Sequence, residues 1–142
     1  MRKFILDCST TMAFFFQDET SPYVDAVFEA LTQDARALVP PIWPLEVLNT
    51  CLAAERRQRL RFKEVEEILS ILEAFPIEVV GYPDLPAVMR IYPLARRHHL
   101  SSYDAAYLEL ALREELPLVS LDKKLNAAAK KAAISLWSPV TK

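Results

Sequence analysis

The stretch LSSYDAAYLELAL, residues 100–112, predicts a helix that opens with a carboxylate. Either serine of the pair 101–102 can cap its N-terminus, and neither Pro nor Gly interrupts the residues that follow. Asp104 falls in the first turn, and the next residues on its face are apolar, Leu108 and Ala111. An acid on the inward side of a mostly apolar helix is costly unless another group compensates its charge. The rest of the chain should therefore supply that group.

Short apolar segments alternate with longer helical ones along the chain. Strands are predicted at Lys3–Cys8, Ala37–Val39, Ile77–Val80 and Pro117–Leu121, with a short last one at Ser135–Ser138. Helices are predicted between them, at residues 9–17, 23–37, 45–59, 64–75, 86–99, 100–112 and 123–133. Alternation of this kind is typical of an α/β protein in which helices cover both faces of a parallel sheet.

The prolines and the single glycine refine the predicted boundaries. Pro44 favours a helix start. From that helix Leu45, Leu48 and Leu52 are expected to face the core, and Cys51 is a further candidate. Pro93 should kink or divide the helix at 86–99. Residues 81–83, Gly-Tyr-Pro, predict a turn.

The composition narrows the class of protein. The 142 residues are expected to form one domain, residues 1–142, with a sizeable core. A single glycine, Gly81, excludes both the Walker A loop and the GxGxxG turn. Two isolated cysteines make no disulfide framework, and the longest apolar run, Met12–Phe16, is too short to span a bilayer. We therefore expect a cytoplasmic protein with no membrane partner. Its net charge of −2 means that a nucleic acid would have to meet a local basic patch.

Four carboxylates occupy comparable positions in the predicted fold. Asp7 and Asp122 follow the first and fourth strands, at the edge where open parallel sheets place their sites. Glu46 and Asp104 fall in the opening turns of helices. Each acid alone also has a structural explanation, because a first-turn acid favours the helix dipole by roughly 0.3–1 kcal/mol and an acid before a helix can cap it.

A convergence of the four acids would require a cation. Their mutual repulsion must be neutralised, and no basic residue lies within two positions of Asp7, Glu46 or Asp104. A divalent cation with oxygen ligands meets this need. Mg²⁺ or Mn²⁺ suits an all-carboxylate site better than Zn²⁺ does.

Four segments carry these acids: FILDCS (4–9), PLEVLN (44–49), LSSYDAAYLELA (100–111) and LVSLDKKL (118–125). Together they resemble the four acidic motifs of the PIN domain, and most of all those of the VapC-type toxins of toxin–antitoxin pairs. The third segment is the most specific, because Tyr-Asp-Ala leads into a Leu-rich helix. The resemblance extends over residues 4–125.

The resemblance implies both a fold and an activity. The fold would be a three-layer α/β sandwich around a five-stranded parallel sheet, and the activity that of an Mg²⁺- or Mn²⁺-dependent endoribonuclease. The catalytic quartet would be Asp7, Glu46, Asp104 and Asp122, and the metal ion would be held by Asp7, Asp104 and Asp122. Glu46 would ligate a second ion or orient the attacking water. A bound metal lowers the pKa of that water and stabilises charge on the phosphate.

Residues beside the acids also match the family pattern. Ser9 matches the small polar residue that follows the first acid, and Ser120 matches the hydroxyl residue before the fourth. Some relatives carry a further acid just after the fourth one, where this chain has Lys123 and Lys124. These two lysines are instead candidates to bind substrate phosphates.

The resemblance also implies partners. The substrate would be RNA, a cognate antitoxin would bind the chain, and two copies would form a homodimer. Exposed aromatics near Met12–Phe16 would fit such an interface.

Other functions remain open at this level. The acidic pocket could belong to a non-catalytic or regulatory binding module that has lost its activity. Cleavage driven by the RNA 2′-OH could use His98 and His99. A phosphotransfer domain is disfavoured because Cys8, and not a second acid, follows Asp7. A haloacid dehalogenase is excluded because Ser9 stands where its second aspartate should be.

Overall fold

The computed structural model describes residues 2–81 and 84–139. Within them, four parallel strands form one sheet: β1 (Arg2–Leu6), β2 (Ala35–Val39), β3 (Ile77–Val79) and β4 (Leu118–Val119). The helices are α1 (Cys8–Ala13), α2 (Pro22–Gln33), α3 (Trp43–Arg56), α4 (Phe62–Ala74), α5 (Leu85–His98), α6 (Ser102–Glu114) and α7 (Lys123–Lys131). No helix of the described residues is both long and apolar enough to cross a membrane.

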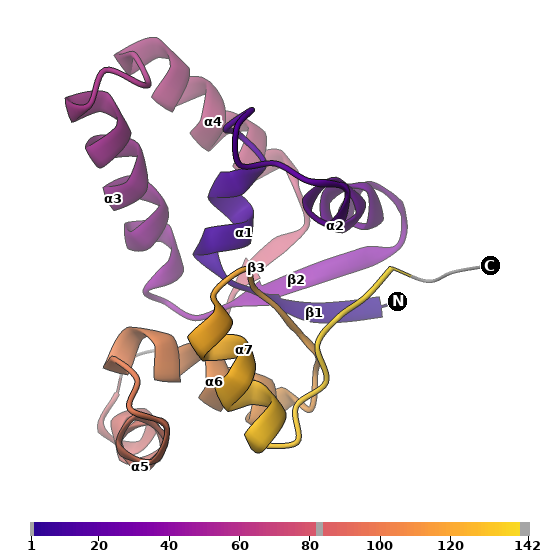
Figure 1. Cartoon of the computed structure of the whole chain (residues 1–142), viewed down its shortest axis with the longest axis vertical. Coiled ribbons are helices and arrows are strands. Elements are labelled where there is room, and N and C mark those ends of the chain that lie inside the picture. The colour runs from indigo at the N-terminus through magenta and orange to yellow at the C-terminus, as the bar shows by residue number, and fades with distance from the viewer. Residues whose placement is uncertain (1, 82–83, 140–142) are drawn as a thin grey trace.

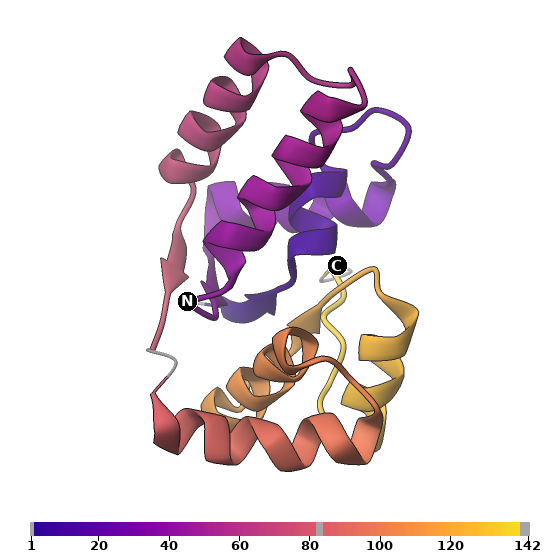
Figure 2. The same ribbon diagram turned by 90° about the vertical axis from the view of Figure 1, so that its left-hand side faces the viewer.

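The sheet has the order β3-β2-β1-β4, so the first strand is central. Its register pairs Phe4 with Ala37 of β2 and Leu6 with Val119 of β4. Figure 1 shows α1 to α4 on one side of the sheet and α5, α6 and α7 on the other, and Figure 2 gives the same separation from the side. The last three residues of β1 are fully buried without alternation, as expected for a strand covered on both faces. The predicted α/β class is confirmed.

The predicted fifth strand is absent from the sheet. At Ser135–Ser138 the structure has a single parallel bridge between Leu136 and Leu118. Leu118 is hydrogen-bonded on both sides of that bridge, donating to Ser135 and accepting from Trp137, each at 2.9 Å. Because β4 itself is only two residues long, it offers no edge for a longer ladder. The sheet of the described residues therefore has four strands, and the expectation of five was wrong.

Several predicted boundaries also move. The first helix, expected at residues 9–17, ends at Ala13. The helix expected at 23–37 ends at Gln33, and the strand expected to start at Ala37 begins at Ala35. Pairing of Ala35 with Arg2 in the ladder outweighs the helical preference of alanine. The helix α5 continues through Pro93 without dividing. Of the turn predicted at 81–83, only Gly81 belongs to the described residues, and its φ is +83°.

The helix α3 buries a different face from the one predicted. Leu45, Leu48 and Leu52 were expected in the core, but they are 58%, 38% and 37% exposed. Of the core candidates only Cys51 is buried, together with Trp43, Val47 and Ala54. The indole of Trp43 fixes this rotation, because it is buried and its Nε1 donates to Thr11 Oγ1 at 3.2 Å. The three leucines are left as an apolar stripe on the surface.

The aromatics after Met12 belong to the core. Phe14 stacks on Phe28 with ring centroids 4.0 Å apart, and Phe16 is only 6% exposed. The guanidinium of Arg59 covers the ring of Phe16 at 4.5 Å. The expected exposed aromatic surface at Met12–Phe16 is therefore not present.

Candidate active site

The four predicted acids lie at the carboxyl edge of the sheet. Asp7 directly follows the central strand β1, and Asp122 lies between β4 and α7. Glu46 and Asp104 occupy the first turns of α3 and α6. Each of Asp7, Glu46 and Asp104 has its carboxyl pKa raised in part by repulsion from another of these acids. Repulsion therefore couples each of these three acids to at least one other member of the predicted quartet.

Asp7 is the most buried of the four, at 6% exposed. Its Oδ2 accepts hydrogen bonds from the hydroxyls of Ser9 and Ser120, both at 2.7 Å. Burial raises the pKa of Asp7, the two hydroxyls lower it in part, and the charge of Asp122 raises it further. Both hydroxyl bonds fall on Oδ2, which leaves Oδ1 without a side-chain hydrogen bond among the described residues.

The two serines connect the ends of β1 and β4. Ser9 Oγ accepts from the backbone N–H of Leu121 at 3.2 Å, and Ser120 Oγ accepts from that of Asp122 at 3.0 Å. A further bond comes from Asn126, whose Nδ2 donates to the Ser120 carbonyl at 2.9 Å. The sequence places Ser9 and Ser120 beside different acids, but in the structure both contact Asp7.

Asp122 is the N-cap of α7. Its Oδ1 accepts from the backbone N–H groups of Lys124 at 2.9 Å and Leu125 at 3.0 Å. The sequence-based interpretation that Asp122 caps a helix is therefore confirmed. It does not exclude a second role, because both bonds fall on Oδ1 and leave Oδ2 free of hydrogen bonds within the described residues.

Asp104 is half-buried in the first turn of α6, and Ser101 caps that helix by accepting from the Asp104 N–H at 3.1 Å. Burial raises the pKa of the Asp104 carboxyl, and repulsion from Asp122 and Asp7 adds to this. The cation that opposes the shift is Lys124 on α7. It does not outweigh burial and repulsion, so Asp104 keeps a raised pKa.

Glu46 is held by a residue that sequence reasoning did not assign to the site. The hydroxyl of Tyr107 donates to Glu46 Oε1 at 2.5 Å, from α6 to α3. Burial raises the pKa of Glu46, this hydrogen bond lowers it, and repulsion from Asp7 and Asp104 raises it. The only sequence signal for Tyr107 is its spacing from Asp104, since residues three apart share a helix face.

The donor set fits a hard divalent cation. The carboxylates are oxygen donors with an excess of negative charge, which Mg²⁺ and Mn²⁺ bind well. No three His, Cys, Asp or Glu side chains in residues 2–81 and 84–139 form a ready-made metal cluster. The donor chemistry therefore suits Mg²⁺ or Mn²⁺, but the described residues hold no preformed metal cluster.

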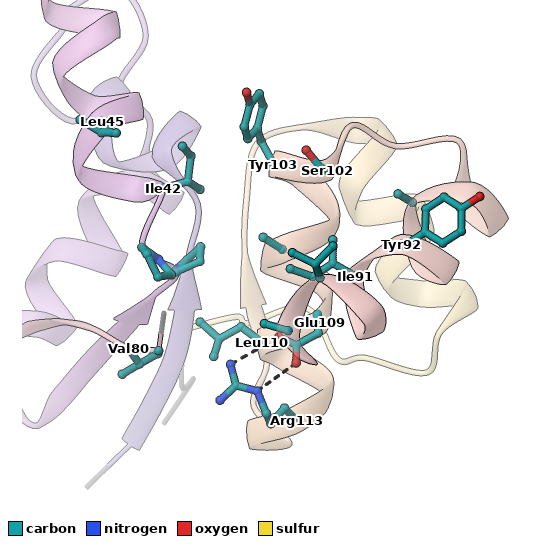
Figure 3. A pocket seen from close by; sticks show the side chains of 17 residues that line it. Ile42, Leu45, Val80, Ile91, Tyr92, Ser102, Tyr103, Glu109, Leu110 and Arg113 are labelled. Carbon is teal, nitrogen blue, oxygen red and sulfur yellow. Dashed lines mark hydrogen bonds and ion pairs between the residues drawn. The ribbon is translucent and has the colours of Figure 1, made fainter. Parts of the chain in front are cut away.

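An apolar cavity of about 400 Å³ is lined by residues from the first turns of α3 and α6. It lies between the start of α3 and the helices α5 and α6 (Figure 3). Leu45 and Tyr103, which line it, are the sequence neighbours of Glu46 and Asp104. Tyr103 is 57% exposed, so the cavity opens among exposed apolar side chains next to the candidate site.

A buried acid forms the polar part of this cavity. Glu109 is 5% exposed and accepts from Arg90 Nε at 2.8 Å and Arg113 Nε at 2.9 Å. Burial alone would raise the pKa of Glu109, but the bonds from Arg113 and Arg90 outweigh it and hold that pKa below its usual range. The network ties α5 to α6, so Glu109 serves the fold.

The basic residues differ in whether they already form ion pairs with acidic side chains. Arg59 forms ion pairs with Asp18 at 2.7 Å and Glu19 at 3.1 Å, and Arg61 pairs with Glu64 at 3.3 Å. Lys123 and Lys124 are exposed at the start of α7, beside Asp122. They are therefore the basic residues best placed to meet a polyanion at the acids.

A parallel α/β sheet with acids at its carboxyl edge defines the class of this protein. The family model for the PIN domain matches residues 4–131, and the chain belongs to that family. PIN domains are generally nucleases, and such nucleases typically use divalent metals. No curated protein matches the sequence significantly.

Solved structures share the fold at low sequence identity. VapBC2 from Rickettsia felis, bound to a DNA fragment from its promoter, has a TM-score of 0.66 and 12% identity, covering 95% of this chain and 97% of that one. A toxin–antitoxin complex from Klebsiella pneumoniae has a TM-score of 0.63 and 16% identity, with 98% and 99% covered. PAE2754 from Pyrobaculum aerophilum has a TM-score of 0.62 and 20% identity, with 89% and 86% covered. These likenesses establish the fold.

Proposed function

We propose that the chain is an Mg²⁺- or Mn²⁺-dependent endoribonuclease and the toxin of a VapBC-type toxin–antitoxin pair. The observation that carries this proposal is the acid group around Asp7. Its carboxylate is buried, oriented through one oxygen by Ser9 and Ser120, and repelled by Asp122. Such a group is costly to the fold, because a buried charge lowers stability unless another group compensates it.

Asp7, Asp104 and Asp122 would hold the metal ion. Bound there, a divalent cation would acidify a water molecule and stabilise negative charge on the scissile phosphate. Asp7 and Asp122 are suited to this role because each keeps one carboxylate oxygen free of side-chain and capping hydrogen bonds within the described residues. Ser9 and Ser120 support the site by fixing the direction of the Asp7 carboxylate.

Glu46 would orient the attacking water or hold a second cation. Its Oε1 is occupied by Tyr107, so Oε2 is the oxygen available for either task. Lys123 and Lys124 would contact the phosphates that flank the scissile bond, since they are exposed next to Asp122.

The proposed partners are an antitoxin and a second copy of the chain. An antitoxin is favoured by the shared fold with VapBC2 and with the Klebsiella toxin–antitoxin complex over nearly the full chain. A homodimer is favoured by the exposed leucine stripe of α3, namely Leu45, Leu48 and Leu52, which faces the apolar cavity at Leu45. Contiguous exposed apolar side chains of this kind mark interaction surfaces.

Cleavage of a defined RNA tests the proposed activity. The full chain should cut a dual-labelled RNA oligonucleotide internally with Mg²⁺ or Mn²⁺ and should stop when EDTA is added. Asp104→Asn should lower the rate by roughly 100-fold or more, the scale for losing one group that acts on developing charge. The matched control is Glu73→Gln, an exposed acid on α4. Cleavage that persists in EDTA, or an equal loss in both variants, would contradict the proposal.

The alternative function is a regulatory binding module without catalysis. The presence of all four acids argues against it, because a module that only binds does not need mutually repelling carboxylates. One assay distinguishes the two functions. A binding module would bind RNA or the antitoxin but would not cut RNA at any metal concentration.

A further inference from the structure

Tyr107 is fully buried, with 0% exposure, and is the largest side chain buried to that degree among the described residues. It lies on α6, one turn after Asp104. Its ring packs in the core, but its hydroxyl reaches α3 and donates to Glu46 Oε1. One side chain therefore joins the third acidic segment of the sequence to the second.

The chemistry of the pair fixes the direction of this hydrogen bond. Burial and the nearby carboxylates raise the pKa of Tyr107, so its phenol stays protonated at physiological pH. An ionised Glu46 has only acceptor sites, and the single O–H of Tyr107 must donate to it. The bond occupies Oε1 and restricts rotation of the carboxylate, which leaves Oε2 as the reactive oxygen.

Packing alone does not explain the hydroxyl. A phenylalanine ring would fill the same space, whereas a buried hydroxyl is costly unless it has a partner. The partner found here is one of the four acids and not a backbone group. Two of the other acids have comparable support: Asp7 from the hydroxyls of Ser9 and Ser120, and Asp122 from the amides of α7.

We propose that Tyr107 is a positioning residue for Glu46, donating a fixed hydrogen bond that aims the free carboxylate oxygen at the reacting water or cation. This inference rests on the proposed nuclease function. It assigns to the third segment a second task besides supplying Asp104. The chain thereby couples the placement of α6 to the geometry of the carboxylate on α3.

The test is Tyr107→Phe in the full chain, compared with Tyr23→Phe. Tyr23 is a matched control because its hydroxyl donates to the Trp137 carbonyl at 2.9 Å, away from the acids. With a labelled RNA and saturating Mn²⁺, Tyr107→Phe should lower kcat by about 10–100-fold, the range for supporting residues around metal sites. Its KM should stay within about twofold, since such residues do not bind substrate directly. Tyr23→Phe should leave kcat unchanged.

A double variant separates positioning from a merely structural effect. If Tyr107 acts through Glu46, then Tyr107→Phe should cause no further loss of kcat in a Glu46→Gln background. Equal losses in both backgrounds would overturn the proposal. So would a fall in kcat that Tyr23→Phe reproduces.

A structural readout keeps the inference testable if no RNA is cut. In a crystal structure of Tyr107→Phe, the Glu46 carboxylate should leave its wild-type orientation while Asp7 and Asp122 keep theirs. An unchanged Glu46 carboxylate would overturn the positioning role. An inactive wild-type chain with a displaced Glu46 would instead contradict the nuclease function and leave the positioning role supported.

Discussion

Ser120 donates a 2.7 Å hydrogen bond to the carboxylate of Asp7, a residue 113 positions earlier in the chain. The same Ser120 hydroxyl accepts from the backbone N–H of Asp122. One buried hydroxyl thus connects the first and fourth acids of the candidate site. Its position at the ends of two adjacent parallel strands makes it part of the fold and of the proposed active site.

Substitution Ser120→Ala should weaken both activity and stability. Asp7 would lose one of its two hydroxyl donors, and we expect a loss of about 10-fold or more in RNA cleavage, as for other residues that orient metal ligands. The unfolding free energy should fall by roughly 1–3 kcal/mol, because a buried polar group loses its partner. Cleavage kinetics and urea denaturation measure the two effects. Ser120→Thr should keep much of the wild-type activity. A Ser120→Ala chain that is as active as the wild type would contradict the role of Ser120 in orienting Asp7.

Asp7→Asn should stabilise the metal-free protein at neutral pH. The folded pKa of Asp7 is raised above its ordinary value by burial, so the folded state binds its proton more tightly than the unfolded state. Stability from this group is therefore present at low pH and is lost as pH rises through the folded pKa. The substitution removes this pH-dependent loss of stability. We therefore expect Tm to rise by about 2–5 °C, the change that roughly 1 kcal/mol produces in a chain of this size.

Calorimetry at several pH values and with Mg²⁺ measures this effect. The advantage of Asp7→Asn should shrink as pH falls toward 4 and should reverse when Mg²⁺ is added, because only the wild type gains binding energy. A variant less stable than the wild type in EDTA at pH 7 would contradict the account.

Glu109→Ala should destabilise the packing of α5 on α6. Arg90 and Arg113 would both lose their shared carboxylate, and removal of a charged hydrogen-bond partner costs roughly 1.5–3 kcal/mol. Because the pKa of Glu109 is lowered, its contribution is present above the ordinary carboxyl pKa and is lost as pH falls through the folded one. Denaturant unfolding at pH 7 and pH 3 tests both statements. An exposed acid, Glu66, serves as the control for the same substitution.

Leu48→Glu should break the proposed homodimer without unfolding the chain. Leu48 is 38% exposed on the leucine stripe of α3, so a charge there costs little in the monomer and much in an apolar interface. Light scattering after gel filtration should show a dimer for the wild type and a monomer for the variant. Leu69→Glu on α4 is the matched control, since Leu69 is 39% exposed. A monomeric wild type would refute the homodimer.

The sequence predicts the central features of this fold because local signals and tertiary demands agree there. Phe4–Leu6 is apolar without interruption, and the structure buries it as the central strand. Ser101 was one of two capping candidates, and it caps α6. Asp7 and Asp122 could be assigned to one edge because parallel strands end together.

Features that depend on distant contacts could not be predicted. Leucines at 45, 48 and 52 suggested a buried face, but the bond from Trp43 to Thr11 rotates α3 the other way. The shortness of β4 reduces the expected fifth strand to one bridge at Leu136. No local pattern connects Tyr107 to Glu46, since only the folded chain brings its hydroxyl to that carboxylate.

The bond between Ser120 and Asp7 also has a consequence for the newly made chain on the ribosome. Asp7 is synthesised more than a hundred residues before its partner. Until Ser120 and Asp122 have left the ribosome and β4 has paired with β1, the first acid lacks its orienting hydroxyl and its neighbouring carboxylate. The four acids can therefore come together only after β4, the last strand of the sheet in the described residues, has been translated.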